Sequence, residues 1–225
     1  MYQTNKTMTA SRVLAIFIFF ICSSASVATG DVRERWVLRK NQNGIKVYTS
    51  PLKGYGYEQA RVVNTVRSSL SAIVALLLDT KNYPNWMYGC ESVQTLKVIS
   101  PQEFYNYQVT GLPWPMSDRD VVAHFKVTQD PTTKVVTFAK IGHETFIPEK
   151  KGLVRVKNFR SVLTLTPLSK DSVRMELEVY LDPGGSVPDW FYNENLVQSP
   201  YNTTVGTIKQ LPKYQNASLS FIREY

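Results

Sequence analysis

The segment SVPDWFYNENLVQSPYNTTVGTIKQLP, residues 186–212, decides the fold because it predicts a long apolar helix at the end of a strand-rich chain. Pro188 suits the first turn of a helix, where its missing N–H has no partner to lose. Apolar residues then recur at helical spacing as far as Leu211, and Pro212 marks the end. Pro200 removes one backbone hydrogen bond within the segment, so we expect either one kinked helix or two separate helices.

The residues upstream of this helix are typical of antiparallel strands, because apolar and polar residues alternate between turn signals. Asn41-Gln42-Asn43-Gly44 separates two such runs and predicts a hairpin. On one strand, Val121, Ala123, Phe125 and Val127 share a face. Further strands are predicted over 36–39, 45–49, 57–67, 93–99, 103–110, 134–141, 153–166 and 173–181.

Only one other segment, residues 69–80, has a helical period, with Ser68 or Ser69 as its N-cap. The final apolar helix must be buried, and the concave face of a curved sheet is the surface available for it. We therefore predict an α+β fold in which a curved antiparallel sheet of eight or nine strands wraps around the C-terminal helix.

The N-terminal residues 1–28 have the order of a signal peptide: basic Lys6 and Arg12, an apolar run from 13 to 21, and the small-residue site Ser26-Val27-Ala28. An uncleaved N-terminal anchor is an alternative. A lipid-modified Cys22 fits less well, because bulky residues precede it. We expect export to the periplasm or secretion, followed by one domain over 29–213 and a C-terminal tail over 214–225.

Charge and cysteine content limit the partners of the exported chain. Without residues 1–28, the net charge falls from +8 to +6, because two lysine or arginine residues and no acidic ones are lost. This charge favours transient contact with anionic membrane surfaces. No dense basic run is present, so nucleic acid is not expected. Cys90 is the only cysteine left, which excludes a disulfide within the exported chain, and one domain of this size is expected to be a monomer.

Five segments, in this order along the chain, resemble motifs of the START lipid-transfer family, which has the helix-grip fold. They are GIKVY at 44–48, YPNW at 83–86, PMSDRD at 115–120, PEKKGLVR at 148–155 and PGGSVPDW at 183–190. The resemblance extends from Trp36 to about Lys213. It implies that a single lipid or other hydrophobic small molecule is bound in an internal cavity and carried, stored or sensed there. Cholesterol-type members have an acidic and a basic side chain in the cavity, where a rough alignment places Asn106 and Phe125, so sterol cannot be assumed as the ligand.

The predicted ligand-binding residues are apolar or aromatic side chains of the sheet and the final helix, each of which could instead be an ordinary core residue. Tyrosines are favoured because a buried hydroxyl needs a partner. The candidates are Leu77, Met87, Tyr105, Tyr107, Phe138, Phe146, Phe159, Met175, Leu177, Trp190, Val197, Tyr201 and Val205. Arg119 and Arg155 could bind a headgroup or only hold a turn, Arg119 by pairing with a neighbouring carboxylate. The apolar loop 112–116 could insert into a bilayer or cover the cavity mouth.

The sequence offers little for catalysis, and no cofactor or metal is expected. His124 and His143 are the only histidines, and no spacing typical of a metal site or a nucleophile elbow occurs. The alternative function is a helix-grip enzyme of the polyketide aromatase/cyclase type, which would need an acid–base pair inside the cavity, such as Tyr107 with His124 or Arg119. A protein-recruiting module would instead have a filled core and an exposed apolar patch.

Overall fold

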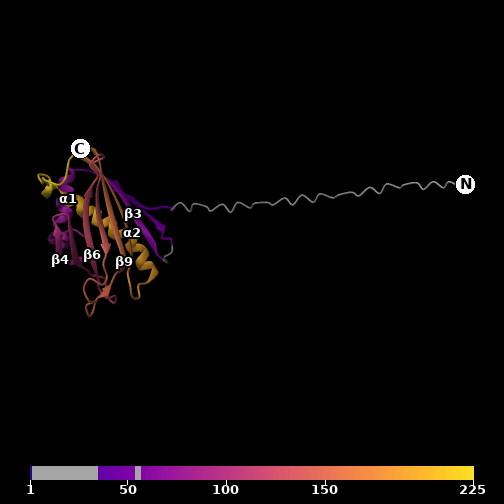
Figure 1. Ribbon diagram of the computed structural model, residues 1–225. Helices are drawn as coiled ribbons and strands as arrows, with labels where there is room; N and C mark the ends of the chain where they lie inside the picture. Colours follow the sequence, from indigo (N-terminus) through magenta and orange to yellow (C-terminus); the bar gives the residue numbers. More distant parts are fainter. Residues whose placement is uncertain (2–34, 54–56) are drawn as a thin grey trace. The chain divides into compact units, whose positions relative to one another are not determined.

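One mainly antiparallel sheet forms most of the fold (Figure 1). The computed structural model describes Met1, residues 35–53 and residues 57–225. Apart from Met1, the predicted signal peptide therefore lies outside the described residues. The described residues 35–53 and 57–225 belong to a single compact unit.

Nine strands follow one another across the sheet in the order β1-β2-β3-β10-β9-β7-β6-β5-β4, so β1 and β4 are its edges and the barrel is not closed. The strands are β1 (Val37–Gln42), β2 (Ile45–Pro51), β3 (Glu58–Arg67), β4 (Cys90–Ser100), β5 (Glu103–Thr110), β6 (Arg119–Gln129), β7 (Val136–Gly142), β9 (Lys157–Ser169) and β10 (Ser172–Asp182). The short β8 (Val154–Arg155) pairs with β6 in parallel. The predicted sheet is thus confirmed, with β8 added to it.

The predicted hairpin between β1 and β2 forms, whereas β9 extends beyond the predicted end of its strand. Asn43 and Gly44 both have positive φ, 53° and 74°, and join β1 to β2 with Gln42 opposite Ile45. The end of the strand predicted over 153–166 is wrong, because β9 continues through Pro167 to Ser169. Pro167 pairs with Val173 next to a register shift, the kind of irregularity at which a strand tolerates proline.

Two α-helices and two short 3₁₀ helices complete the fold: α1 (Leu70–Leu78), η1 (Thr80–Asn85), α2 (Asp189–Gln210) and η2 (Leu211–Tyr214). Ser69 caps α1, its hydroxyl accepting a hydrogen bond from the Ala72 N–H at 3.1 Å. Pro200 lies within α2, so the alternative of two separate helices is wrong. Figure 1 shows α2 crossing one face of the sheet, behind β6 and β9 in this view.

The contact between α2 and η1 depends on Gly206. A Cβ atom added to this glycine would lie 2.1 Å from the carbonyl oxygen of Trp86, far inside van der Waals contact. The missing side chain therefore lets α2 approach the backbone at the end of η1.

Residues 214–225, predicted as a tail, form a final segment that packs on α1. Ile222 is buried and joins the main hydrophobic core. The Glu224 carboxylate accepts hydrogen bonds from the N–H groups of Leu70 and Ser71, at 2.9 and 2.8 Å. These are orphan donors at the start of α1, and an acidic group is favourable there.

Candidate ligand-binding cavity

A cavity of about 610 Å³ lies between α2 and the inner face of the sheet. Most of its wall is formed by β5, β6, β7, β9, β10 and α2, together with residues 86–89 and 111–113, and Asn64 of β3 and Leu77 of α1 also line it. Apolar side chains dominate this wall, and the volume is within the range of about 300–1,000 Å³ typical of small-molecule sites. The core is therefore hollow, which argues against the protein-recruiting module with a filled core.

Strand alternation determines which side chains reach the cavity, because successive residues of a strand point to opposite faces. On β6, Val121, Ala123 and Phe125, which were predicted to share one face of a strand, line the cavity. On β10, Met175 and Leu177 do so as well. The apolar face of each of these strands was correctly identified from the sequence.

The structure brings seven of the fifteen predicted residues into the cavity wall. They are Leu77, Met87, Arg119, Phe138, Phe159, Met175 and Leu177. The other eight are not in the wall: Tyr105, Tyr107, Phe146, Arg155, Trp190, Val197, Tyr201 and Val205.

The tyrosines of β5 are on the opposite face from the one predicted. Tyr105 stacks on Phe146, with ring centroids 4.4 Å apart, and on His124, at 4.6 Å. The inward residues of β5 are instead Asn106 and Gln108. The aromatic face of this strand is covered by the segment after β7 and not by ligand.

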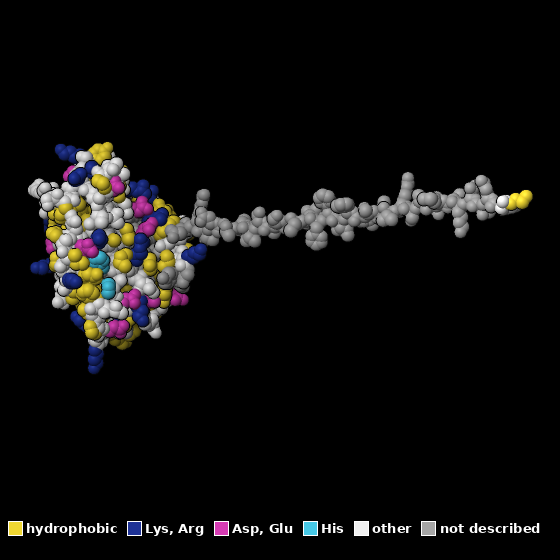
Figure 2. Space-filling view, viewed as in Figure 1, with side chains coloured by type: hydrophobic (Ala, Val, Ile, Leu, Met, Phe, Trp, Pro, Cys, Tyr) yellow, Lys and Arg dark blue, Asp and Glu magenta, His cyan; other side chains and the backbone are white. Residues whose placement is uncertain are grey.

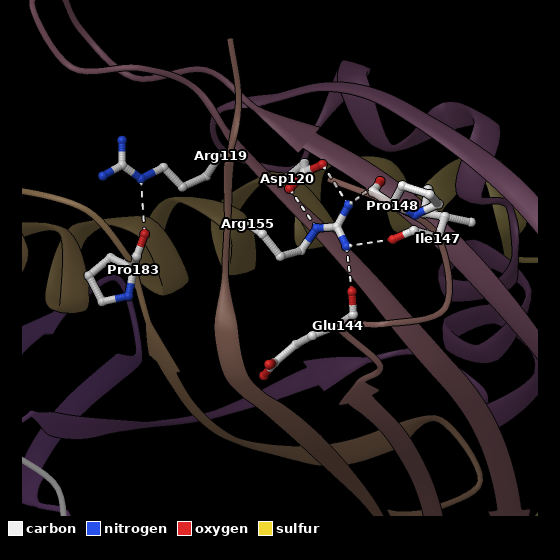
Figure 3. Close-up of polar contacts among 7 residues, drawn as sticks. All are labelled: Arg119, Asp120, Glu144, Ile147, Pro148, Arg155 and Pro183. Carbon is white, nitrogen blue, oxygen red and sulfur yellow. Dashed lines mark hydrogen bonds and ion pairs between the residues drawn. The ribbon is translucent and has the colours of Figure 1, made fainter. Parts of the chain in front are cut away.

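Tyr107 and Arg155 belong to a buried structural cluster on that outer side. The Arg155 guanidinium pairs with Asp120 and donates to the carbonyl oxygens of Glu144, Ile147 and Pro148, at 2.6, 3.2 and 3.2 Å (Figure 3). Its donors are therefore committed to the loop 144–148. Burial raises the pKa of the Tyr107 hydroxyl to about 12.

On α2 the apolar stripe faces the sheet and not the cavity. Val197, Tyr201 and Val205 pack against a core cluster on β2 and β3 formed by Ile45, Val47 and Val62. Tyr201 also accepts a hydrogen bond from the Asn43 side chain, 3.1 Å away. Trp190, at the start of the helix, is 68% exposed.

The strip of α2 that lines the cavity is made of small residues in its second half, from Ser199 onward: it consists of Phe191, Tyr192, Asn195, Leu196, Ser199, Pro200, Thr203, Thr204 and Thr207. The hydroxyls of Thr204 and Thr207 donate to backbone carbonyls one turn earlier, at 2.8 and 2.9 Å. Because these hydroxyls already donate hydrogen bonds within the helix, this part of the wall does not require a hydrogen-bonding group from a ligand.

Arg119 lines the cavity and also holds the loop that leads into α2. Its Nε donates to the carbonyl oxygen of Pro183 at 3.0 Å (Figure 3). Its Nη2 donates to the carbonyl oxygen of Gly184, also at 3.0 Å, and its Nη1 donates to that of Ser117. The prediction that it pairs with a neighbouring carboxylate is wrong. Arg119 does hold the turn, but through three carbonyl oxygens.

Three polar groups of the cavity wall are not among the predicted ligand-binding residues, although the alignment with cholesterol-type members places one of them, Asn106, in the cavity. Asn106 is 1% exposed, and neither atom of its carboxamide has a hydrogen-bond partner among the described residues. The indole N–H of Trp86 is likewise buried and unpartnered within the described part of the chain. Lys140 of β7 faces the cavity two residues after Phe138. Strand alternation through Val136 and Phe138 is the signal that could have placed this lysine inside.

The acid–base pairs considered for an enzyme do not converge in the cavity. Tyr107 and His124 lie outside its wall, and Arg119 is bound to carbonyl oxygens. Figure 2 shows both histidines at the molecular surface, beside charged side chains. Among the described residues, no cluster of three or more His, Cys, Asp or Glu could hold a metal, and no helix is long and apolar enough to cross a membrane.

Comparison with known proteins agrees with this geometry. A family model described as "START domain" matches residues 27–215. The chain belongs to the START family. Proteins of this family bind and transfer lipids, and the helix-grip arrangement of sheet and C-terminal helix described above is their fold.

Individual START relatives include both bacterial and animal proteins. The chain is 31% identical over 194 residues to the uncharacterized protein PA1579 of Pseudomonas aeruginosa, covering 86% of this chain and 92% of that protein. It is 27% identical over 163 residues to the phosphatidylcholine transfer protein of Bos taurus, covering 70% and 75% of the two chains.

Solved START structures superpose on most of the domain. The STAR-related lipid transfer protein from Xanthomonas axonopodis matches with a TM-score of 0.71 and 29% identity, covering 79% of this chain and 98% of that one. Human StAR-related lipid transfer protein 5 has a TM-score of 0.70 at 17% identity, covering 80% and 87%, and this likeness shows the fold alone.

Proposed function

We propose that this protein is a non-enzymatic carrier that encloses one lipid or similar hydrophobic molecule beneath α2. The observation that supports this most directly is the apolar cavity of about 610 Å³ between the helix and the sheet. Burial of apolar surface contributes about 25 cal/mol per Å², so a ligand burying ~300 Å² gains several kcal/mol before entropic costs. That driving force requires no catalytic group.

The test is recovery of lipid from the cavity and its loss when the cavity is filled. The purified domain is extracted with organic solvent and the extract is analysed by mass spectrometry, in parallel with uptake of a fluorescent fatty acid and a fluorescent phospholipid from vesicles. We expect recovered lipid and saturable uptake. Absence of both from a folded protein contradicts the carrier function.

A matched pair of variants separates the cavity from the rest of the sheet. Ser161 on β9 lines the cavity, and its neighbour Arg160 is exposed. Ser161→Phe occupies ligand space, so uptake should fall about tenfold or more, while Arg160→Phe should leave it unchanged. Equal uptake by the two variants argues that lipid binds elsewhere.

Cavity access is proposed to occur at a membrane surface, through the loop 111–116. Leu112 and Pro113 line the cavity, and the adjacent Trp114 is 91% exposed. Tryptophan favours the membrane interface, so this loop can enter the headgroup region beside the cavity. Trp114→Ala should slow transfer between vesicles several-fold and leave equilibrium binding intact. Leu168→Ala, at an exposed apolar position outside the cavity wall, is the control.

Export is proposed from the N-terminal sequence, with residues 1–28 acting as a signal peptide. The supporting feature is the order of basic, apolar and small residues described above. Fractionation of cells that express the full chain, with N-terminal sequencing of the product, tests this. A mature protein that begins near Thr29 in the periplasm or medium is expected, and an intact N-terminus in the cytoplasm contradicts the proposal.

A further inference from the structure

Lys140 brings a positive charge into an otherwise apolar part of the cavity. It is paired across the sheet with Phe125 on β6 and Ser161 on β9, and all three line the cavity. Its Nζ lies 4.8, 4.9 and 5.6 Å from the ring centroids of Tyr83, Phe125 and Phe138. Across residues 35–53 and 57–225, no carboxylate lies within 4.0 Å of this ammonium.

The surroundings of Lys140 only partly offset the cost of its charge. Burial lowers the pKa of Lys140 to about 8, the direction expected for an ammonium removed from water. The ionisable group that acts on Lys140 is the thiol of Cys90, and burial raises the pKa of that thiol to about 11, so it supplies no counter-charge near pH 7. The three aromatic rings contribute cation–π attraction but no counter-charge. Lys140 as a whole residue is half-buried, and an unpaired charge that faces a cavity in this way is a feature of candidate functional sites.

Asn106 supplies a second, independent indication that a polar ligand group enters here. Its side chain is 1% exposed, and both its Oδ1 and Nδ2 lack a hydrogen-bond partner among the described residues. The register places Asn106 opposite Ala123, one inward-facing row away from the row of Phe104, Phe125 and Lys140. Buried amides are nearly always hydrogen-bonded, so this one needs a partner from outside the chain.

Arg119 is the less suitable partner for an anion in the same cavity. Three of its nitrogens donate to the carbonyl oxygens of Ser117, Pro183 and Gly184. Lys140 has no such acceptor among the described residues, and all three of its N–H donors can be directed at a ligand.

We propose that the preferred ligand is an acidic amphiphile whose anionic oxygens, from a carboxylate or a phosphate, pair with Lys140 and accept a hydrogen bond from the Asn106 amide, with its alkyl part along the apolar wall. This inference rests on the carrier function proposed above and specifies the ligand class. The anionic end lies inside the cavity, because both polar groups are on its wall.

The experiment compares ligands that differ only in charge. Binding of oleic acid and methyl oleate, and of lysophosphatidic acid and monooleoylglycerol, is measured by calorimetry at pH 7 for the wild type and for Lys140→Met. The wild type should prefer the acidic member of at least one pair, which also distinguishes a carboxylate from a phosphate ligand. Lys140→Met should lose about 10–100-fold in affinity for that acid and keep its affinity for the neutral partner.

Two further variants make the result specific. Lys126→Met removes a lysine of β6 that is 52% exposed and pairs with Glu103, so its affinities should match those of the wild type. Asn106→Leu should weaken acid binding less than Lys140→Met does, and thermal unfolding checks that each variant is folded. Equal wild-type affinity for acidic and neutral ligands overturns this inference but leaves the carrier function standing. Absence of binding by all four ligands overturns this inference, and the carrier function falls with it only if lipid recovery and vesicle uptake also fail.

Discussion

Arg155 and Asp120 form a bidentate ion pair in which Nε lies 2.8 Å from Oδ1 and Nη2 lies 3.1 Å from Oδ2. Both side chains are 1% exposed. The pair ties β8, through Arg155, to β6, and the same guanidinium binds three carbonyl oxygens of the loop 144–148. Arg155 therefore has a structural role, although the sequence also allowed a headgroup contact.

Arg155→Met should destabilise the protein by about 3–5 kcal/mol, because it leaves the Asp120 carboxylate buried without its counter-charge. Chemical denaturation measures this loss. Arg174→Ala is the control, since its ion pair with Glu176 lies at the surface, where such pairs are worth about 0–1 kcal/mol. A loss below about 1 kcal/mol for Arg155→Met would show that the Arg155–Asp120 ion pair contributes little to the free energy of unfolding.

Lys140 predicts a pH dependence with a definite sign. Its pKa is about 8 in the folded chain against an ordinary value of 10.5, so between these pH values the unfolded chain binds more protons and stability rises with pH. Below pH 8 the cost of the buried charge is fully present. Lys140→Met should therefore be more stable than the wild type at pH 7, by roughly 3 kcal/mol at most, and this advantage should disappear as pH approaches 10.5.

Thermal unfolding of ligand-free wild type and Lys140→Met at pH 7 and pH 9.5 tests this prediction. The titratable groups that face Lys140 stay protonated between pH 7 and pH 9.5, because burial raises the pKa of Cys90 to about 11 and raises that of Tyr83 further. Phe125 and Ser161, the cross-strand neighbours, are not titratable in this range. A Lys140→Met variant that is less stable than the wild type at pH 7 would mean that the cation–π contacts outweigh the burial cost.

The fold was predictable because strand alternation and a helical period each repeat over many residues. Val121, Ala123 and Phe125 on β6 share one face, as predicted, and α2 follows the segment that was predicted to be helical. The continuation of β9 through Pro167 was not predicted. It depends on a bulge formed by β9 and β10 together, which the sequence of one strand does not reveal.

The cavity was harder to predict because hydrophobicity does not distinguish a wall that faces ligand from one that faces protein. On β5 the more aromatic side, with Tyr105, is covered by Phe146, while the polar Asn106 points inward. On α2 the apolar residues Val197 and Val205 fill the gap to the sheet, and small residues are left facing the cavity. Space for a ligand requires small side chains, and the pattern of large apolar residues in a sequence does not indicate where these lie.

Gly206 should be intolerant of substitution although it lies within a helix. Alanine normally stabilises a helix by about 1 kcal/mol relative to glycine, but here its Cβ would lie 2.1 Å from the Trp86 carbonyl oxygen. Gly206→Ala should instead cost about 1–3 kcal/mol and weaken ligand retention, because Trp86 and α2 both line the cavity. Lys209→Ala, at an exposed position of the same helix, is the control for thermal unfolding and lipid uptake. A more stable Gly206→Ala protein contradicts the close approach of α2.

The C-terminal segment should contribute to stability through one carboxylate. Glu224 accepts from two N–H groups at the start of α1, so Glu224→Ala leaves both donors without this acceptor and should cost about 1–2 kcal/mol. Arg223→Ala serves as the control, because the contacts of Arg223 with Gln129 use its backbone N–H and carbonyl oxygen and survive the change. Chemical denaturation of both variants measures the difference. If they are equally stable, then Ser69 alone caps α1 sufficiently, and the Glu224 carboxylate adds nothing to the stability of the helix.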